Sequence, residues 1–177
     1  MPFDTLPTRC SNRLPSFDYR SPLTYFLTIC TNRRERCLGE VRQSTAHLSL
    51  LGKMVADEWL RTPLVRPGVV LDEWIIMPDH VHGILTLPAS DFNDKSEQGD
   101  DSLQSPLGYR PRSLASLVGG FKAACSRRFQ EMLGDRRDSL WQRNYYEAII
   151  RSEERLEVVR KYIQENPVRL ALKRRQA

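Results

Sequence analysis

The residues best suited to chemistry in this sequence are two histidines separated by one residue. His80 and His82 lie in the apolar run 74–87 and are two of only three histidines in the chain. If this run is a β-strand, His80, His82, Ile84 and Thr86 line one face, because successive side chains of a strand point to opposite sides. Neutral imidazole is the commonest side-chain metal ligand. The pair therefore indicates part of a metal site, although both histidines could instead only form hydrogen bonds within a buried strand.

A second candidate lies near the end of the chain, on a helix that the sequence predicts after Ser152. The apolar positions of that helix are Leu156, Val159 and Ile163. Tyr162 and Asn166 are four residues apart and therefore lie one above the other on the flank of this apolar stripe. Taken alone, they are also typical of a tyrosine at the margin of a core and of an asparagine where a helix stops before Pro167.

The segments that must position these residues predict an α+β fold. In order, the sequence predicts a strand at 23–31, a helix from Ser44 to Thr62-Pro63, a hairpin of strands at 69–76 and 80–87, a helix at 114–133 between the capping residues Ser113 and Gly134, a strand at 140–151 and the helix after Ser152. This order fits a ferredoxin-like split β-α-β arrangement with a four-stranded antiparallel sheet, two packing helices and an extra C-terminal helix.

Length and composition favour a single domain. The chain has 177 residues, of which 40% are hydrophobic, and no apolar run approaches the roughly 20 residues of a membrane span. The start of the chain lacks the pattern of a signal peptide, so we expect a cytoplasmic protein without a membrane partner. We expect an irregular basic arm at 1–22, one domain at 23–170 with a flexible acidic insertion at about 89–112, and a basic tail at 171–177.

The charge distribution suits a polyanion. The net charge is +5, but residues 89–104 contain five acids and one lysine, so the rest of the chain carries about +9. A basic face that is merely solvated explains the same numbers equally well. The candidate nucleic-acid-binding residues are Arg33, Arg34, Lys122, Arg127, Arg143 and Arg169.

Three motifs together resemble the single-tyrosine HUH transposases, and among them the REP-associated tyrosine transposases. They are Met-Pro-Asp-His-Val-His at 77–82, Trp-Gln-Arg-Asn-Tyr-Tyr at 141–146 and Tyr-Ile-Gln-Glu-Asn-Pro at 162–167. The resemblance runs from about residue 25 to 170, with the acidic segment as an insertion.

The resemblance implies a metal-dependent endonuclease and strand transferase for single-stranded DNA beside hairpins or palindromic repeats. It implies that His80 and His82 bind Mg²⁺, with Mn²⁺ also competent, and that Asn166 is a third ligand or its neighbour. It further implies that Tyr162 is the nucleophile, in either a monomer or a homodimer, although Tyr145 and Tyr146 on the preceding strand are competing candidates. The alternative function is that of a domesticated, non-catalytic DNA-hairpin-binding protein.

Overall fold

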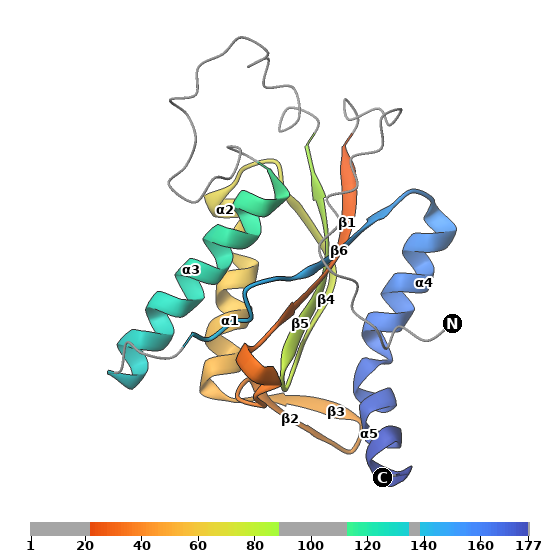
Figure 1. Ribbon diagram of the computed structural model, residues 1–177. Coiled ribbons are helices and arrows are strands. Elements are labelled where there is room, and N and C mark those ends of the chain that lie inside the picture. Colours follow the sequence, from red (N-terminus) through yellow and green to blue (C-terminus); the bar gives the residue numbers. More distant parts are fainter. Residues whose placement is uncertain (1–21, 89–112, 135–138, 177) are drawn as a thin grey trace.

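A four-stranded antiparallel sheet lies at the centre of the protein in the computed structural model, which describes residues 22–88, 113–134 and 139–176 (Figure 1). Its strands are β1 (Leu23–Cys30), β4 (Val70–Met77), β5 (His80–Leu87) and β6 (Tyr146–Ile150), in the spatial order β4-β5-β1-β6. Every neighbouring pair is antiparallel. The predicted α+β class, with a four-stranded antiparallel sheet, is therefore confirmed, and the strand order is that of a split β-α-β arrangement.

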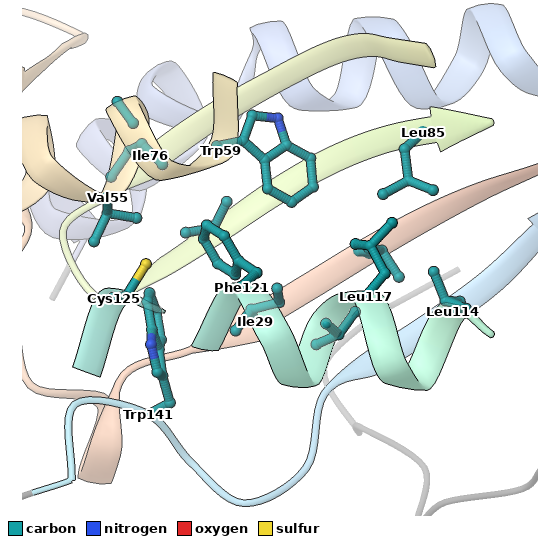
Figure 2. Close-up of a cluster of buried hydrophobic side chains, with 14 of the residues drawn as sticks. Ile29, Val55, Trp59, Ile76, Leu85, Leu114, Leu117, Phe121, Cys125 and Trp141 are labelled. Atoms are coloured by element: carbon teal, nitrogen blue, oxygen red, sulfur yellow. The ribbon is translucent and has the colours of Figure 1, made fainter. Parts of the chain in front are cut away.

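Two helices, α1 (Leu50–Leu60) and α3 (Leu114–Leu133), cover one face of the sheet and enclose the main core (Figure 2). The rings of Trp59 and Phe121 pack edge to face there, with centroids 5.5 Å apart. Trp59 lies so close to β5 that a Cβ added at Gly83 would be 2.3 Å from its ring. A glycine is therefore required at this position for α1 to pack on the strand.

The predicted ends of α3 are confirmed. The Ser113 hydroxyl accepts a hydrogen bond from the Ser116 amide, and Gly134 ends the helix in the left-handed conformation with φ 67°. The helix α4 (Glu153–Gln164) likewise begins after the capping residue Ser152. None of the helices in the described part of the chain has the length and apolar character needed to span a membrane.

The helix predicted from Ser44 begins later, because residues 39–48 form a hairpin of β2 (Gly39–Arg42) and β3 (Thr45–Leu48). Gln43 and Ser44 form its two-residue turn with φ of 49° and 62°, which is the conformation that tight hairpins favour. Helix α1 then starts where the Ser49 hydroxyl accepts from the Gly52 amide. The short helix α2 (Thr62–Val65) follows, with Pro63 in its first turn.

The strand predicted at 140–151 is restricted to β6. Before it, Trp141 forms only an isolated bridge with Thr31. The carbonyl oxygens of Gln142 and Asn144 accept hydrogen bonds from the Lys122 ammonium, 2.9 and 3.1 Å away. Lys122 therefore holds a segment that forms no continuous strand before β6.

The end of the chain is more helical than predicted. Pro167 lies in the first turn of a further helix, α5 (Asn166–Gln176), and the Arg169 amide donates to the Glu165 carbonyl 3.0 Å away. A helix tolerates proline in its first turn, so the proline does not stop the chain from remaining helical into the segment expected as a tail. The predicted arm at 1–22 and the acidic insertion lie outside the described residues, apart from residue 22.

Candidate active site

Helix α4 packs on the face of the sheet opposite to α1 and α3 (Figure 1). The two histidines lie on this face, since their rings contact one another and the His82 ring contacts Tyr162 of α4. On β5, Ile84 contacts Val159 and Ile163 of α4, whereas Val81 and Leu85 belong to the core under α1 and α3. The predicted division of β5 into two faces is therefore confirmed. His80 and His82 lie on the α4 side.

The side chains of the two histidines converge. Nε2 of His80 lies 3.1 Å from Nε2 of His82. The other ring nitrogens are held from outside the pair: Nδ1 of His80 is 2.6 Å from Oδ1 of Asp79, and Nδ1 of His82 is 2.9 Å from Oγ1 of Thr28. A hydrogen-bond partner on the outer nitrogen, often a carboxylate, is the usual arrangement for metal-binding histidines, since it fixes the orientation of each ring. The donor set therefore fits a divalent metal ion.

Burial keeps His82 in the form that can bind a metal. Its exposed fraction is 4%. Burial, together with the neighbouring charge of His80, lowers the pKa of His82 well below 6.5. The imidazole is therefore neutral at pH 7 and has a lone pair to donate.

Asp79 links the histidines to the end of β1. Burial raises the pKa of its carboxyl, but the hydrogen bond from His80 and the charges of His80 and Arg34 outweigh that effect and leave it below 3.8. Nη1 of Arg34 lies 3.6 Å from Oδ2 of Asp79. The Asp79 carbonyl also accepts from both the amide and the hydroxyl of Thr31, each 3.0 Å away. Asp79 is therefore an ionised and well-anchored partner for His80.

Tyr162 reaches the histidines from α4 of the same chain. Its ring centroid lies 5.3 Å from that of His82 and 6.0 Å from that of Phe26. The Arg169 guanidinium lies over the Tyr162 ring, 5.5 Å from the ring centroid. The fold thus brings together a tyrosine and a histidine pair that are about 80 residues apart in sequence.

Asn166 is buried, with an exposed fraction of 8%, and is the first residue of α5. Among the described residues, no third histidine, cysteine, aspartate or glutamate is placed to bind a metal together with His80 and His82. A third protein ligand from these residues would have to be another oxygen donor, such as an amide. Ligation by Asn166 stays a prediction.

The predicted nucleic-acid-binding residues are widely separated. Arg33 and Arg34 lie in the short helix η1 (Asn32–Arg34), both with positive φ, and only Arg34 approaches the histidines. Arg127 and Arg143 are exposed on α3 and before β6. Lys122 is used within the fold, since three carbonyl oxygens accept from its ammonium; burial lowers its pKa to about 8.

The competing tyrosines differ in their surroundings. Tyr146 packs edge to face against Phe26, with centroids 6.1 Å apart, so it lies on the same side of the sheet as Tyr162. Tyr145 lies on the other side, where its ring is 5.6 Å from the Lys122 ammonium. Only Tyr162 among the three has a ring contact with a histidine within the described part of the chain.

The sequence analysis missed two residues that hold the histidines. Thr28 could not be identified, because its contact with His82 depends on the register between β1 and β5, which are more than 50 residues apart. Asp79 has a local signal, since an acidic residue directly precedes His80 in the motif at 77–82.

Comparison with protein families matches part of the chain. A family model described as "Transposase IS200 like" matches residues 108–166. The matched segment contains Tyr162 and Asn166 and ends before most of α5; the histidine pair lies outside it. An uncharacterized protein of Haemophilus influenzae is 34% identical over 172 residues, which cover 90% of this chain and 88% of the relative.

Two solved structures are similar. A REP-associated tyrosine transposase bound to a REP hairpin is 23% identical, with a TM-score of 0.52, and the match covers 83% of this chain and 67% of that one. This likeness supports the fold. A putative transposase from Deinococcus radiodurans is 20% identical with a TM-score of 0.46, over 81% of this chain and 89% of that one.

Proposed function

Because residues 108–166 match the model of the IS200-like transposase family, we propose that this chain belongs to that family and that it cleaves and rejoins single-stranded DNA beside hairpins or palindromic repeats. Membership of the family implies DNA cleavage and transposition. We assign the finer steps to named residues: Tyr162 is the nucleophile, and His80, His82 and Asn166 hold Mg²⁺, with Mn²⁺ also competent.

One observation carries the assignment. The Tyr162 ring lies 5.3 Å from the His82 ring, and Nε2 of His82 lies 3.1 Å from Nε2 of His80. Phe26 lies at the same distance from the His82 ring, but only Tyr162 adds a hydroxyl that could act as a nucleophile. Since all three side chains belong to one chain, a monomer would contain a complete site.

The chemistry explains these residue types. A divalent ion at the histidines, when bound, polarises the scissile phosphate. The Tyr162 oxygen attacks the phosphorus and displaces the 3′ oxygen of the preceding nucleotide, which leaves a 5′-phosphotyrosine and a free 3′ hydroxyl. Attack by that hydroxyl, or by another, restores a phosphodiester and releases the tyrosine. Cleavage and joining are therefore one reaction in two directions and need no nucleotide cofactor.

Two arginines would help to bring the DNA to this site. Arg169 lies over the Tyr162 ring and is exposed, and Arg34 lies beside Asp79. Guanidinium groups suit phosphate because they offer several donors in one plane. The solved relative with a REP hairpin supports a hairpin as the element that this chain recognises.

The test uses a single-stranded DNA hairpin with a flanking single strand, labelled at either end, in Mg²⁺ or Mn²⁺. We expect the 3′-labelled fragment to become covalently attached and the 5′-labelled fragment to be released. Tyr162→Phe should abolish the adduct, whereas Tyr146→Phe, a matched change on the same side of the sheet, should retain it. An adduct on Tyr146, or attachment through a 3′ phosphate, would contradict the assignment. Hairpin binding without any adduct would favour a non-catalytic hairpin-binding protein.

A further inference from the structure

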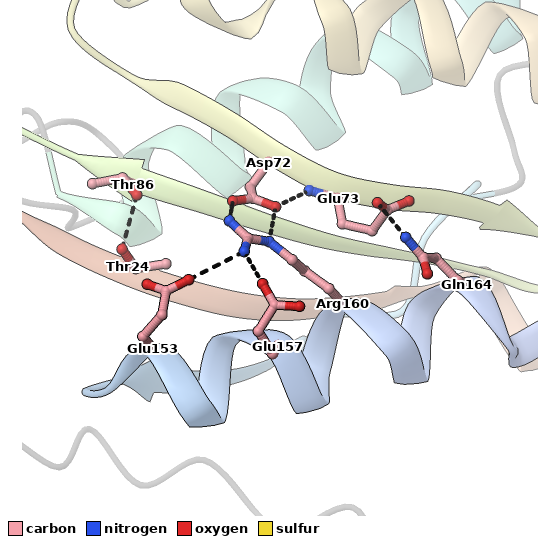
Figure 3. Close-up of polar contacts among 8 residues, drawn as sticks. All are labelled: Thr24, Asp72, Glu73, Thr86, Glu153, Glu157, Arg160 and Gln164. Carbon is pink, nitrogen blue, oxygen red and sulfur yellow. Dashed lines mark hydrogen bonds and ion pairs between the residues drawn. The ribbon is translucent and has the colours of Figure 1, made fainter.

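Helix α4 also makes polar contacts with strand β4 (Figure 3). The Arg160 guanidinium donates two parallel hydrogen bonds to Asp72 of β4, from Nε to Oδ1 at 2.9 Å and from Nη2 to Oδ2 at 2.7 Å. One turn later, Nε2 of Gln164 donates to Oε2 of Glu73, 3.0 Å away. These two pairs join α4 to the edge strand of the sheet.

The acceptors are available because β4 contains a β-bulge. The register between β4 and β5 changes between Leu71, which pairs with Leu85, and Trp74, which pairs with Gly83. One extra residue is therefore inserted at Asp72 and Glu73. In a regular strand two consecutive side chains point to opposite faces, whereas here both acidic side chains reach α4.

Arg160 is held in place from its own helix as well. Nη1 of Arg160 lies 3.2 Å from Oε1 of Glu153 and also pairs with Glu157. The side chains of Arg160 and Asp72 are 30% and 25% exposed, so the two hydrogen bonds between them are partly shielded from water. A bidentate guanidinium–carboxylate pair fixes direction as well as distance.

The spacing along α4 connects this pair to the nucleophile. At about 100° per residue, Arg160 and Gln164 lie on one flank of the Val159 and Ile163 stripe, and Tyr162 lies on the other. Apolar packing is non-directional, so the stripe alone would tolerate rotation of the helix about its axis. The pairs on the Arg160 flank restrict that rotation, which would otherwise move Tyr162 relative to His82.

We infer that Asp72 and Arg160 are positioning residues for the reaction: the bidentate pair sets the rotation of α4 and so presents Tyr162 to the histidines. This inference rests on the proposed role of Tyr162 as nucleophile. It separates two functions of one helix, since the residues that hold the helix on the sheet are not the one that lies beside the histidines.

The test is a double-mutant cycle with Asp72→Asn, Arg160→Gln and both together. The rate of covalent attachment is measured in single turnover at saturating hairpin, beside the hairpin Kd and the thermal unfolding midpoint. We expect the single variants to lose about 10- to 100-fold in rate, because small misplacements of a reacting group have effects of this size. The Kd should stay within about threefold, since phosphate contacts dominate affinity. The double variant should be no slower than the slower single variant, because each residue acts through the other.

Two control variants make the same kinds of substitution at an arginine and an aspartate that do not join α4 to β4. Arg155→Gln alters an exposed arginine of α4 that forms no ion pair with another described residue, and Asp57→Asn alters an exposed aspartate of α1 on the other face of the sheet. Both should keep the rate of the unmodified chain. Asp72→Glu retains the charge but lengthens the side chain by one methylene, so it should fold even if Asp72→Asn does not, and should still slow attachment.

The outcomes separate this inference from the proposed function. No adduct with the unmodified chain would overturn the proposed function and the inference with it. Adduct formation by the unmodified chain, with unchanged rates in Asp72→Glu and Arg160→Gln, would overturn the inference alone. So would multiplicative losses in the double variant. Val118→Ala removes buried volume from α3, on the other face of the sheet; an equal loss of rate in that variant, at a matched fall in unfolding midpoint, would assign the effect to global stability.

Discussion

Replacing Thr28 with valine tests whether the hydrogen bond behind His82 serves a metal site. Oγ1 of Thr28 lies 2.9 Å from Nδ1 of His82, and the two residues are 6% and 4% exposed. Valine keeps the shape of threonine but removes the oxygen, so water cannot readily replace the lost partner. Loss of a hydrogen-bond partner from a buried polar group costs about 1–3 kcal/mol of folding stability. Loss of such a partner of a metal ligand typically lowers metal affinity about 10- to 100-fold.

Thr24→Val is the matched control. Thr24 lies on the same face of β1, and its hydroxyl is 2.8 Å from the Thr86 hydroxyl, so this change also removes a threonine–side-chain hydrogen bond. Calorimetric titration with Mn²⁺ and thermal unfolding with and without Mn²⁺ measure affinity and stability separately. We expect both variants to lose stability but only Thr28→Val to lose affinity. Equal Mn²⁺ affinities for the two variants would refute the reasoning and leave Thr28 with a structural role.

Three further predictions concern packing, pH and catalysis. Gly83→Ala should destabilise the fold by about 1–3 kcal/mol in thermal unfolding, because the added Cβ would lie 2.3 Å from the buried Trp59 indole. Gly120→Ala should instead stabilise α3 by up to about 1 kcal/mol, because an added Cβ there would have no atom within 4 Å. The pKa of Lys122 is about 8 in the folded chain, compared with 10.5 ordinarily. Between these two pH values the unfolded chain binds more protons than the folded chain, so the free energy of unfolding should rise with pH. Lys122→Met should reduce this pH dependence, measured by denaturant titrations at several pH values. His80→Ala or His82→Ala should abolish cleavage while hairpin affinity changes by no more than about threefold, and a parallel loss of both would contradict a metal-binding role.

The elements that could be predicted from the sequence are those determined by neighbouring residues. The two faces of β5 follow from alternation along one strand, and the ends of α3 follow from a serine cap and a glycine in the left-handed conformation. The β2–β3 hairpin was missed because its turn residues, Gln43 and Ser44, are not the Asn-Gly or Asp-Gly pair that normally indicates a positive φ.

The placement of Tyr162 required more than helical periodicity. The spacing with Val159 and Ile163 put it on the flank of the apolar stripe, and the structure agrees. Which residues that flank would meet depends on how β1 pairs with β5, since this pairing brings Phe26 and Thr28 beside Ile84 and His82. The resemblance to a known family, and not the pattern of residues, connected Tyr162 with the histidines.

The bulge in β4 explains why the residues that hold α4 could not be found by counting along the strand. Leu71 and Trp74 are three positions apart, so regular alternation places them on opposite faces of the sheet. Both nevertheless pack against the core under α1 and α3, because the extra residue in the bulge brings their side chains to the same face of the sheet. The same insertion lets Asp72 and Glu73 reach α4 together. A single inserted residue therefore keeps two apolar side chains in one core and supplies the acceptors that fix the helix on the opposite face.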